Sequence, residues 1–192
     1  MKVSFEYAGI YDEVLSEMSR KKLEPNQSKE AEEITKRFKM YLQIKEKKII
    51  SSIEKNSKLK FKRKEIKCYF VNHLAYHAIS NPLTIRISGT MEDMRDILIH
   101  ELIHNIFIDN EKQVIPLIKR TYEDEDFSFK IHVPVLLIER AVTEQIFGQK
   151  YFKTFEQKDR MMNFKFEWPE VDKIYTRYKG DIIRFLKNEN LD

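Results

Sequence analysis

Apolar residues recur at helical spacing in the first 57 residues of the chain. Between residues 7 and 20 the pattern predicts a short amphipathic helix, which would bury the apolar side chains Ile10, Val14, Leu15 and Met18. Pro25-Asn26 then interrupts the pattern. A second helix is predicted from Ser28 to about Lys55, with a buried stripe formed by Ile34, Phe38, Tyr41, Leu42, Ile49 and Ile53. We interpret both helices as scaffold, because stripes of this kind usually form core.

Strand patterns follow in the middle of the chain. Lysines at residues 58–64 alternate with Leu59 and Phe61, which predicts a strand with one solvated face. Residues 66–71 combine β-branched and aromatic side chains, and residues 83–88 alternate before Gly89, so each predicts a further strand. The basic segment 55–67 has a second interpretation as a nucleic-acid patch. We favour the strand, since no aromatic stacking platform interleaves with the charges.

Three helices are predicted in the second half of the chain. Thr90 and Asp93 form a capping box, so one helix should run from about Met91 to Ile108. A buried helix over residues 132–147 would have Pro134 near its start and Gly148 just past its end. After a break at Trp168-Pro169, a closing amphipathic helix is predicted from Val171, Ile174, Tyr175, Tyr178, Ile182, Ile183 and Phe185.

Composition places these elements in a folded, non-membrane protein. The chain has 192 residues, of which 42% are hydrophobic and 34% are charged, and its net charge is +4. This length predicts one domain, with a helical scaffold at 1–57, a sheet and site helices at 58–148 and a C-terminal helical segment at 149–192. The single cysteine, Cys68, cannot form an intramolecular disulfide, and no signal-peptide or membrane-spanning run is present. We therefore expect a cytoplasmic protein.

Candidate chemistry lies inside the predicted helix 91–108. His100 and His104 are four residues apart, so both imidazoles can point at one small ion from one helix face. Glu101 follows the first histidine directly, and a carboxylate in that place can take a proton from a zinc-bound water. From residue 97 to 108 every position except these three and Asn105 is apolar. A buried carboxylate needs a partner, and a dication would supply one. The competing interpretation is a chance match with two satisfied core histidines.

The segment from Ile97 to Ile108 resembles the active-site helix of the zincin metallopeptidases, in which a His-Glu-x-x-His sequence is flanked by uncharged residues. The resemblance implies one Zn²⁺ per chain held by His100 and His104, with Glu101 as general base. It also implies that the strand before this helix is the edge of a sheet and lies along the substrate cleft. The third ligand should come from a second helix, as in the gluzincin branch. The chain departs from that branch at Ile138 and Thr143, where the family often has Asn and Asp.

Two residues compete as the third zinc ligand. Glu139 is the first carboxylate inside the apolar run that begins at residue 133, and we favour it because so apolar a helix would not bury a carboxylate without a partner. His132, seven residues earlier, is the alternative ligand, and as a non-ligand it would hydrogen-bond the developing oxyanion. A second histidine pair, His73 and His77, lies between predicted strands, so we expect surface or cleft-wall histidines there. A second metal site is the less favoured interpretation.

These features predict a single α+β domain with a zincin-like fold. It would contain N-terminal helices, a small mixed sheet, the active-site helix and a second ligand-bearing helix. The expected function is zinc-dependent hydrolysis of peptide bonds in a peptide or protein substrate. One alternative is a non-catalytic zincin-like binding module, with nucleic acid bound through residues 55–67. Another is a zymogen-like enzyme whose N-terminal helices cover the cleft.

Overall fold

The computed structural model describes residues 1–21, 24 and 26–188, so Pro25 of the expected interruption lies outside the described residues. The chain divides into two compact units, one formed by residues 1–47 and 63–105 and the other by residues 48–62 and 106–192. Helices and one small mixed sheet make up the described part, which confirms the α+β class. The expectation of a single domain stays a prediction.

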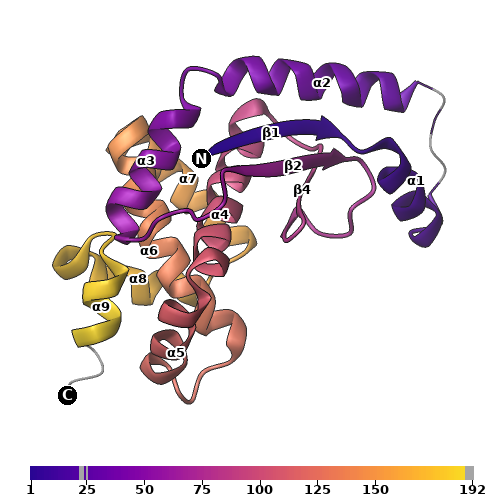
Figure 1. Cartoon of the computed structure of the whole chain (residues 1–192). Coiled ribbons are helices and arrows are strands. Elements are labelled where there is room, and N and C mark those ends of the chain that lie inside the picture. The colour runs from indigo at the N-terminus through magenta and orange to yellow at the C-terminus, as the bar shows by residue number, and fades with distance from the viewer. Residues whose placement is uncertain (22–23, 25, 189–192) are drawn as a thin grey trace. The chain divides into compact units, whose positions relative to one another are not determined.

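Figure 1 labels most of the elements along the chain. The first unit contains β1 (Lys2–Tyr7), α1 (Gly9–Met18), α2 (Gln27–Leu42), β2 (Glu65–Val71), β3 (Ala78–Ser80), β4 (Leu83–Arg86) and α4 (Met91–Asp109) as far as residue 105. The second unit contains most of α3 (Glu46–Ser57), the end of α4, α5 (Glu111–Thr121), α6 (Phe127–Phe147), α7 (Gln149–Met162), α8 (Glu167–Tyr178) and α9 (Ile182–Asn188).

The sheet of the first unit has the strand order β1-β2-β4-β3. β1, β2 and β4 are mutually parallel, and β3 runs antiparallel to β4 at the edge. Strands are therefore confirmed over the two segments predicted at 66–71 and 83–88, whereas β1 was not predicted. The strand that precedes α4 is β4, which pairs on both sides. The expectation that this strand forms the sheet edge is wrong, because the short strand β3 pairs along its outer side.

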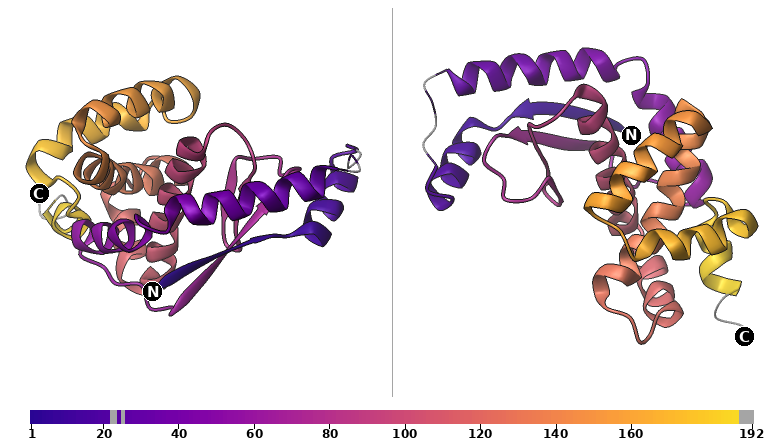
Figure 2. Two further views of the ribbon diagram at one scale, coloured as in Figure 1. Left: turned by 90° about the horizontal axis from the view of Figure 1, so that it is seen from above. Right: turned by 180° about the vertical axis from the view of Figure 1, so that it is seen from behind.

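One face of this sheet is covered by a helix, and the other carries exposed charged side chains on β1 and β2. Phe5 pairs in register with Cys68, and both lie on the face against which Phe38 of α2 packs. The Phe38 ring centroid is 5.5 Å from that of Phe5 and 5.1 Å from that of Phe70. In all the views α2 runs along β1 (Figure 2). The opposite face carries exposed charges, including the cross-strand pair of Lys2 with Glu65.

α1 forms where a helix was expected, but its buried face is not the apolar one. Ile10 and Met18 are 83% and 78% exposed, whereas Asp12 is fully buried. The cause lies outside the helix, because the Asp12 carboxylate accepts hydrogen bonds from the backbone N–H groups of Asn72 and His73. The prediction that the stripe of Ile10, Val14 and Met18 is core is therefore wrong.

The expected long helix over residues 28–55 is two helices, α2 and α3, separated by a turn at residues 43–45. Within the predicted stripe, the side chains that are buried are Phe38, Leu42, Ile49 and Ile53. A physical reason for the break is the side chain of Glu46 at the start of α3, which accepts a hydrogen bond of 2.8 Å from the N–H of Val3. That contact fixes the beginning of α3 against β1.

Residues 58–64 do not form the predicted strand. Side chains satisfy two of their backbone N–H groups, since the N–H of Phe61 donates to Glu54 and the N–H of Lys62 donates to Asp109. At the end of the segment, the carbonyl oxygen of Lys64 accepts from the N–H of Lys2 in β1. Lys58 also has a positive φ of 59°, which interrupts an extended conformation. The lysines at residues 58, 60, 62 and 64 are exposed, as expected of solvated side chains, and Leu59 is buried.

α4 begins with the predicted capping box. The N–H of Asp93 donates to the Thr90 hydroxyl oxygen at 3.1 Å, and the N–H of Thr90 donates to an Asp93 carboxylate oxygen at 2.9 Å. Gly89 precedes the box with a φ of +70°, which favours glycine. The helix then runs to Asp109, one residue beyond its predicted end, and its middle is buried.

α6 is the central helix of the second unit. Its residues 133–139 are all buried, and α5, α7, α8 and α9 pack on it. The N-cap of α6 is Asp126, whose carboxylate accepts from the N–H of Phe129, and Gly148 follows its last residue as predicted. Pro134 therefore lies inside the helix rather than near its start. The stretch between α4 and α6 contains α5.

Trp168 and Pro169 do not break the chain as predicted, because both belong to the first turn of α8. The missing N–H of a proline costs nothing in a first helical turn, where the N–H has no partner within the helix. Trp168 is fully buried and its indole N–H donates to Asp159 at 2.8 Å. The expected closing helix is two helices, α8 and α9.

No helix in the described ranges is long and apolar enough to cross a bilayer.

Candidate metal centre

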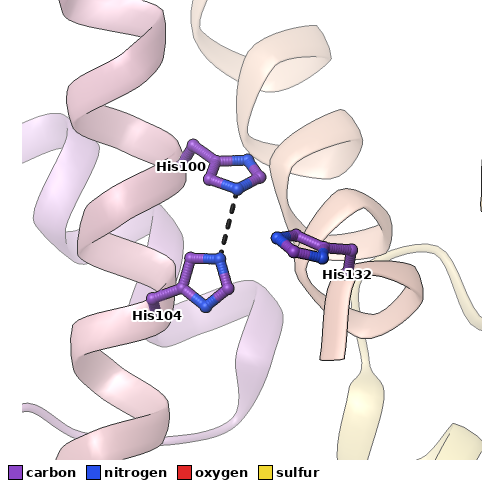
Figure 3. Close-up of side chains that lie close together, drawn as sticks. All are labelled: His100, His104 and His132. Carbon is purple, nitrogen blue, oxygen red and sulfur yellow. Dashed lines mark hydrogen bonds between the residues drawn. The ribbon is translucent and has the colours of Figure 1, made fainter. Parts of the chain in front are cut away.

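His100 and His104 face each other across one turn of α4. Their Nε2 atoms are 3.2 Å apart and their ring centroids are 4.9 Å apart, and both side chains are half-buried (Figure 3). Two imidazole nitrogens that bind one tetrahedral zinc ion at ~2.0–2.1 Å lie about 3.3 Å from each other. The spacing of this pair therefore fits one zinc ion, as the i and i+4 positions predicted.

His132 lies on α6, five residues after its first residue, and its ring orientation is fixed locally. Its Nδ1 is 2.8 Å from the carbonyl oxygen of Ser128, one turn earlier. A carbonyl only accepts, so this contact assigns the proton to Nδ1 and leaves the lone pair on Nε2. Histidine ligands of metals commonly have this arrangement, in which the second nitrogen donates to an oxygen. The ring also stacks on Phe164 with a centroid distance of 4.6 Å.

The three histidines form a group that can hold a metal ion. Each offers one ring nitrogen, and these three nitrogens all lie within 4.8 Å of one another (Figure 3). A set of imidazole nitrogens suits zinc and similar transition metals rather than calcium or magnesium, which prefer oxygen. Among the two candidates for the third ligand, the structure thus places His132 close to the pair. Glu139 is buried on the same helix, and its assignment as a ligand stays a prediction.

Glu101 is 9% exposed. Its Oε2 accepts a hydrogen bond of 2.5 Å from the hydroxyl of Ser80 on β3. Burial raises the pKa of the Cys68 thiol, and the nearby negative charge of Glu101 raises this pKa further. A carboxylate held in this way can exchange a proton through its other oxygen, Oε1.

Three polar residues around Glu101 were not predicted from the sequence to belong to the site: Asn105, Arg63 and Ser80. Asn105 is fully buried, and its Nδ2 donates to the carbonyl oxygens of Ser80 and Glu101, each at 2.9 Å. The guanidinium of Arg63 donates in turn to Oδ1 of Asn105 at 2.8 Å. One signal was present, since Asn105 is the single polar residue between 97 and 108 besides the two histidines and Glu101. No sequence pattern indicated Ser80.

The second histidine pair lies in the loop between β2 and β3, as expected. His73 is not a surface residue, because it is buried and its Nδ1 is 3.1 Å from Asp12 Oδ1. His77 is exposed and its Nδ1 lies 3.2 Å from the guanidinium of Arg86. Each ring therefore has a structural partner. Nucleic-acid binding through residues 55–67 stays the less favoured alternative.

Comparisons of the chain with protein-family models, with curated proteins and with solved structures find no match.

Proposed function

We propose that this protein is a zinc-dependent hydrolase of peptide bonds, with zinc held by His100, His104 and His132. The observation that carries the proposal is the 3.2 Å spacing of the His100 and His104 Nε2 atoms, with a third ring nitrogen within 4.8 Å. His132 is preferred over Glu139 because its ring is already fixed with Nε2 as the lone-pair nitrogen. When bound at three protein ligands, zinc would polarise a carbonyl and acidify a water molecule.

Glu101 would act as the general base. Ser80 holds Oε2 of its carboxylate, so Oε1 is the oxygen that would accept a proton from the attacking water. As the carbon–nitrogen bond breaks, Glu101 would return this proton to the leaving amine nitrogen, which leaves the carboxylate unchanged after each turnover. Glu101 lies between the two histidines of α4, so the base and these two ligands would keep one fixed spatial relation.

The test compares zinc content and peptide hydrolysis in a set of variants. We expect one zinc per wild-type chain, and loss of zinc in His104→Ala. Glu101→Gln should retain zinc and lose at least about 100-fold in kcat, because a general base contributes ~10²–10⁴-fold. His77→Ala is the matched control, since this exposed histidine pairs only with Arg86 in the described contacts and should keep both zinc and activity.

The same measurements decide the third ligand. Loss of zinc in His132→Ala with retention in Glu139→Ala supports the proposed ligand set, and the reverse result assigns the site to Glu139. Full hydrolytic activity in Glu101→Gln, or a wild-type protein that takes up no zinc, would overturn the proposed function.

A further inference from the structure

Ser80 sits where the edge strand of the sheet meets the candidate base. It is the last residue of β3, and its register partner in β4 is Leu83. Its hydroxyl donates to Oε2 of Glu101, although the two residues are 21 positions apart in the sequence. At 2.5 Å the contact has the length of a charge-assisted O–H···O⁻ hydrogen bond, which is roughly twice as strong as a neutral one.

The backbone of Ser80 is fixed independently of this hydroxyl. Its carbonyl oxygen accepts from Asn105 Nδ2 at 2.9 Å, and the same nitrogen donates to the Glu101 carbonyl one turn earlier on α4. Arg63 holds the other end of the Asn105 amide through Oδ1. Because Asn105 is fully buried, the contact is shielded from competing water. β3 is thus tied to α4 at the turn of the helix that carries Glu101.

We propose that Ser80 is a positioning residue that clamps the Glu101 carboxylate, so that Oε1 is presented for proton transfer. The proposal rests on the proposed function of Glu101 as general base. A glutamate side chain has three rotatable bonds, and one fixed oxygen removes most of that freedom. Proton transfer depends steeply on geometry, and a misplacement of ~1 Å can cost about 10²-fold in rate. The clamp acts on the chemical step and leaves the zinc ligands and substrate contacts alone.

The first test is kinetic. Ser80→Ala should lower kcat by about 10- to 100-fold with little change in KM, while zinc content stays at the wild-type level. Ser80→Thr keeps the hydroxyl and should recover most of the lost kcat. Ser88→Ala is the matched control, because the Ser88 hydroxyl only reaches the Arg86 carbonyl, at 3.5 Å, and kcat should stay unchanged.

The second test needs no activity. Crystal structures of the zinc-free wild-type protein and Ser80→Ala should show one Glu101 conformer in the wild type and several in the variant. If the wild-type protein hydrolyses peptides and Ser80→Ala keeps the wild-type kcat, the clamp is refuted and the proposed function stands. If the protein has no hydrolytic activity, the conformer comparison still decides whether Ser80 holds Glu101. A single unchanged Glu101 conformer in Ser80→Ala would overturn the inference.

Discussion

At the scale of single residues, Asp12 shows how a buried carboxylate can orient a helix. Its Oδ1 accepts from the N–H groups of Asn72 and His73, both at 2.8 Å, and its Oδ2 accepts from the Asn72 amide and the Tyr7 hydroxyl. These donors compensate for taking the charge out of water. The helix therefore presents its polar face to the sheet, and Ile10, Val14 and Met18 face outward.

We predict that Asp12→Ala lowers the free energy of unfolding by about 3 kcal/mol, because the backbone N–H groups of Asn72 and His73 lose their acceptor. Urea unfolding followed by circular dichroism measures the change. Glu13→Ala on the same helix is the control, since Glu13 is exposed and its removal should cost less than about 0.5 kcal/mol. Equal stability of the two variants would show that Asp12 is not what orients α1.

At the scale of elements, the start of α4 depends on a glycine. Gly89 has a φ of +70°, and a Cβ built there would lie 2.6 Å from the Asp93 carboxylate oxygen that caps Thr90. Both the backbone conformation and the capping box therefore exclude a side chain at this position. α4 carries His100, Glu101 and His104, so its first turn supports the candidate site.

Gly89→Ala should lower the free energy of unfolding by about 1–2 kcal/mol, from the left-handed backbone and the disturbed cap together. Gly9→Ala provides the comparison, because Gly9 has no positive φ and its nearest atom, Cε1 of Tyr7, is 3.4 Å away. We expect little change or a small gain in that variant. Thermal unfolding distinguishes the two, and a loss at Gly9 as large as the loss at Gly89 would contradict the prediction.

The sequence predicted those elements whose signals are local. The helix that carries His100 and His104 could be predicted from its capping box and from the apolar run that follows. Both signals are contained within 20 residues of sequence. The buried face of α1 could not be predicted, because the donors to Asp12 lie 60 residues away. The same holds for residues 58–64, whose alternating pattern is typical of a strand but whose backbone groups bond to Glu54 and Asp109. The start of α6 was predicted too late, near Pro134, because the residue that caps the helix is Asp126.

At the scale of the whole molecule, the third ligand is the part of the site that local pattern leaves open. His132 and Glu139 lie on one helix, 28 and 35 residues beyond His104 (132 − 104 and 139 − 104), and sequence spacing does not choose between them. The burial of Glu139 favoured it as the ligand. The position of a His132 ring nitrogen near those of His100 and His104 favours His132 instead. The choice depends on tertiary packing and on the hydrogen bond that orients His132, neither of which is encoded in a short motif.

If zinc binds at the proposed site, it should have a measurable effect on the stability of the whole protein. The unfolded chain has no preformed site, so zinc binding adds to the free energy of unfolding. At a free zinc concentration of 100 times Kd the gain is about 2.7 kcal/mol, which for a chain of this size raises Tm by about 5–10 °C. Magnesium at the same concentration should leave Tm unchanged, because the proposed ligands are nitrogens.

The zinc-induced rise in Tm, measured in single variants, distinguishes the proposed zinc ligands from the proposed base. Glu101→Gln should keep the expected zinc-induced rise in Tm, since Glu101 is not among the proposed ligands, and His104→Ala should lose it. Between the two candidates on α6, the variant that abolishes the rise identifies the third ligand, and we expect His132→Ala to do so. If His132→Ala and Glu139→Ala both keep the full rise, α6 supplies no ligand, and the site consists of the α4 histidines with a partner from another element.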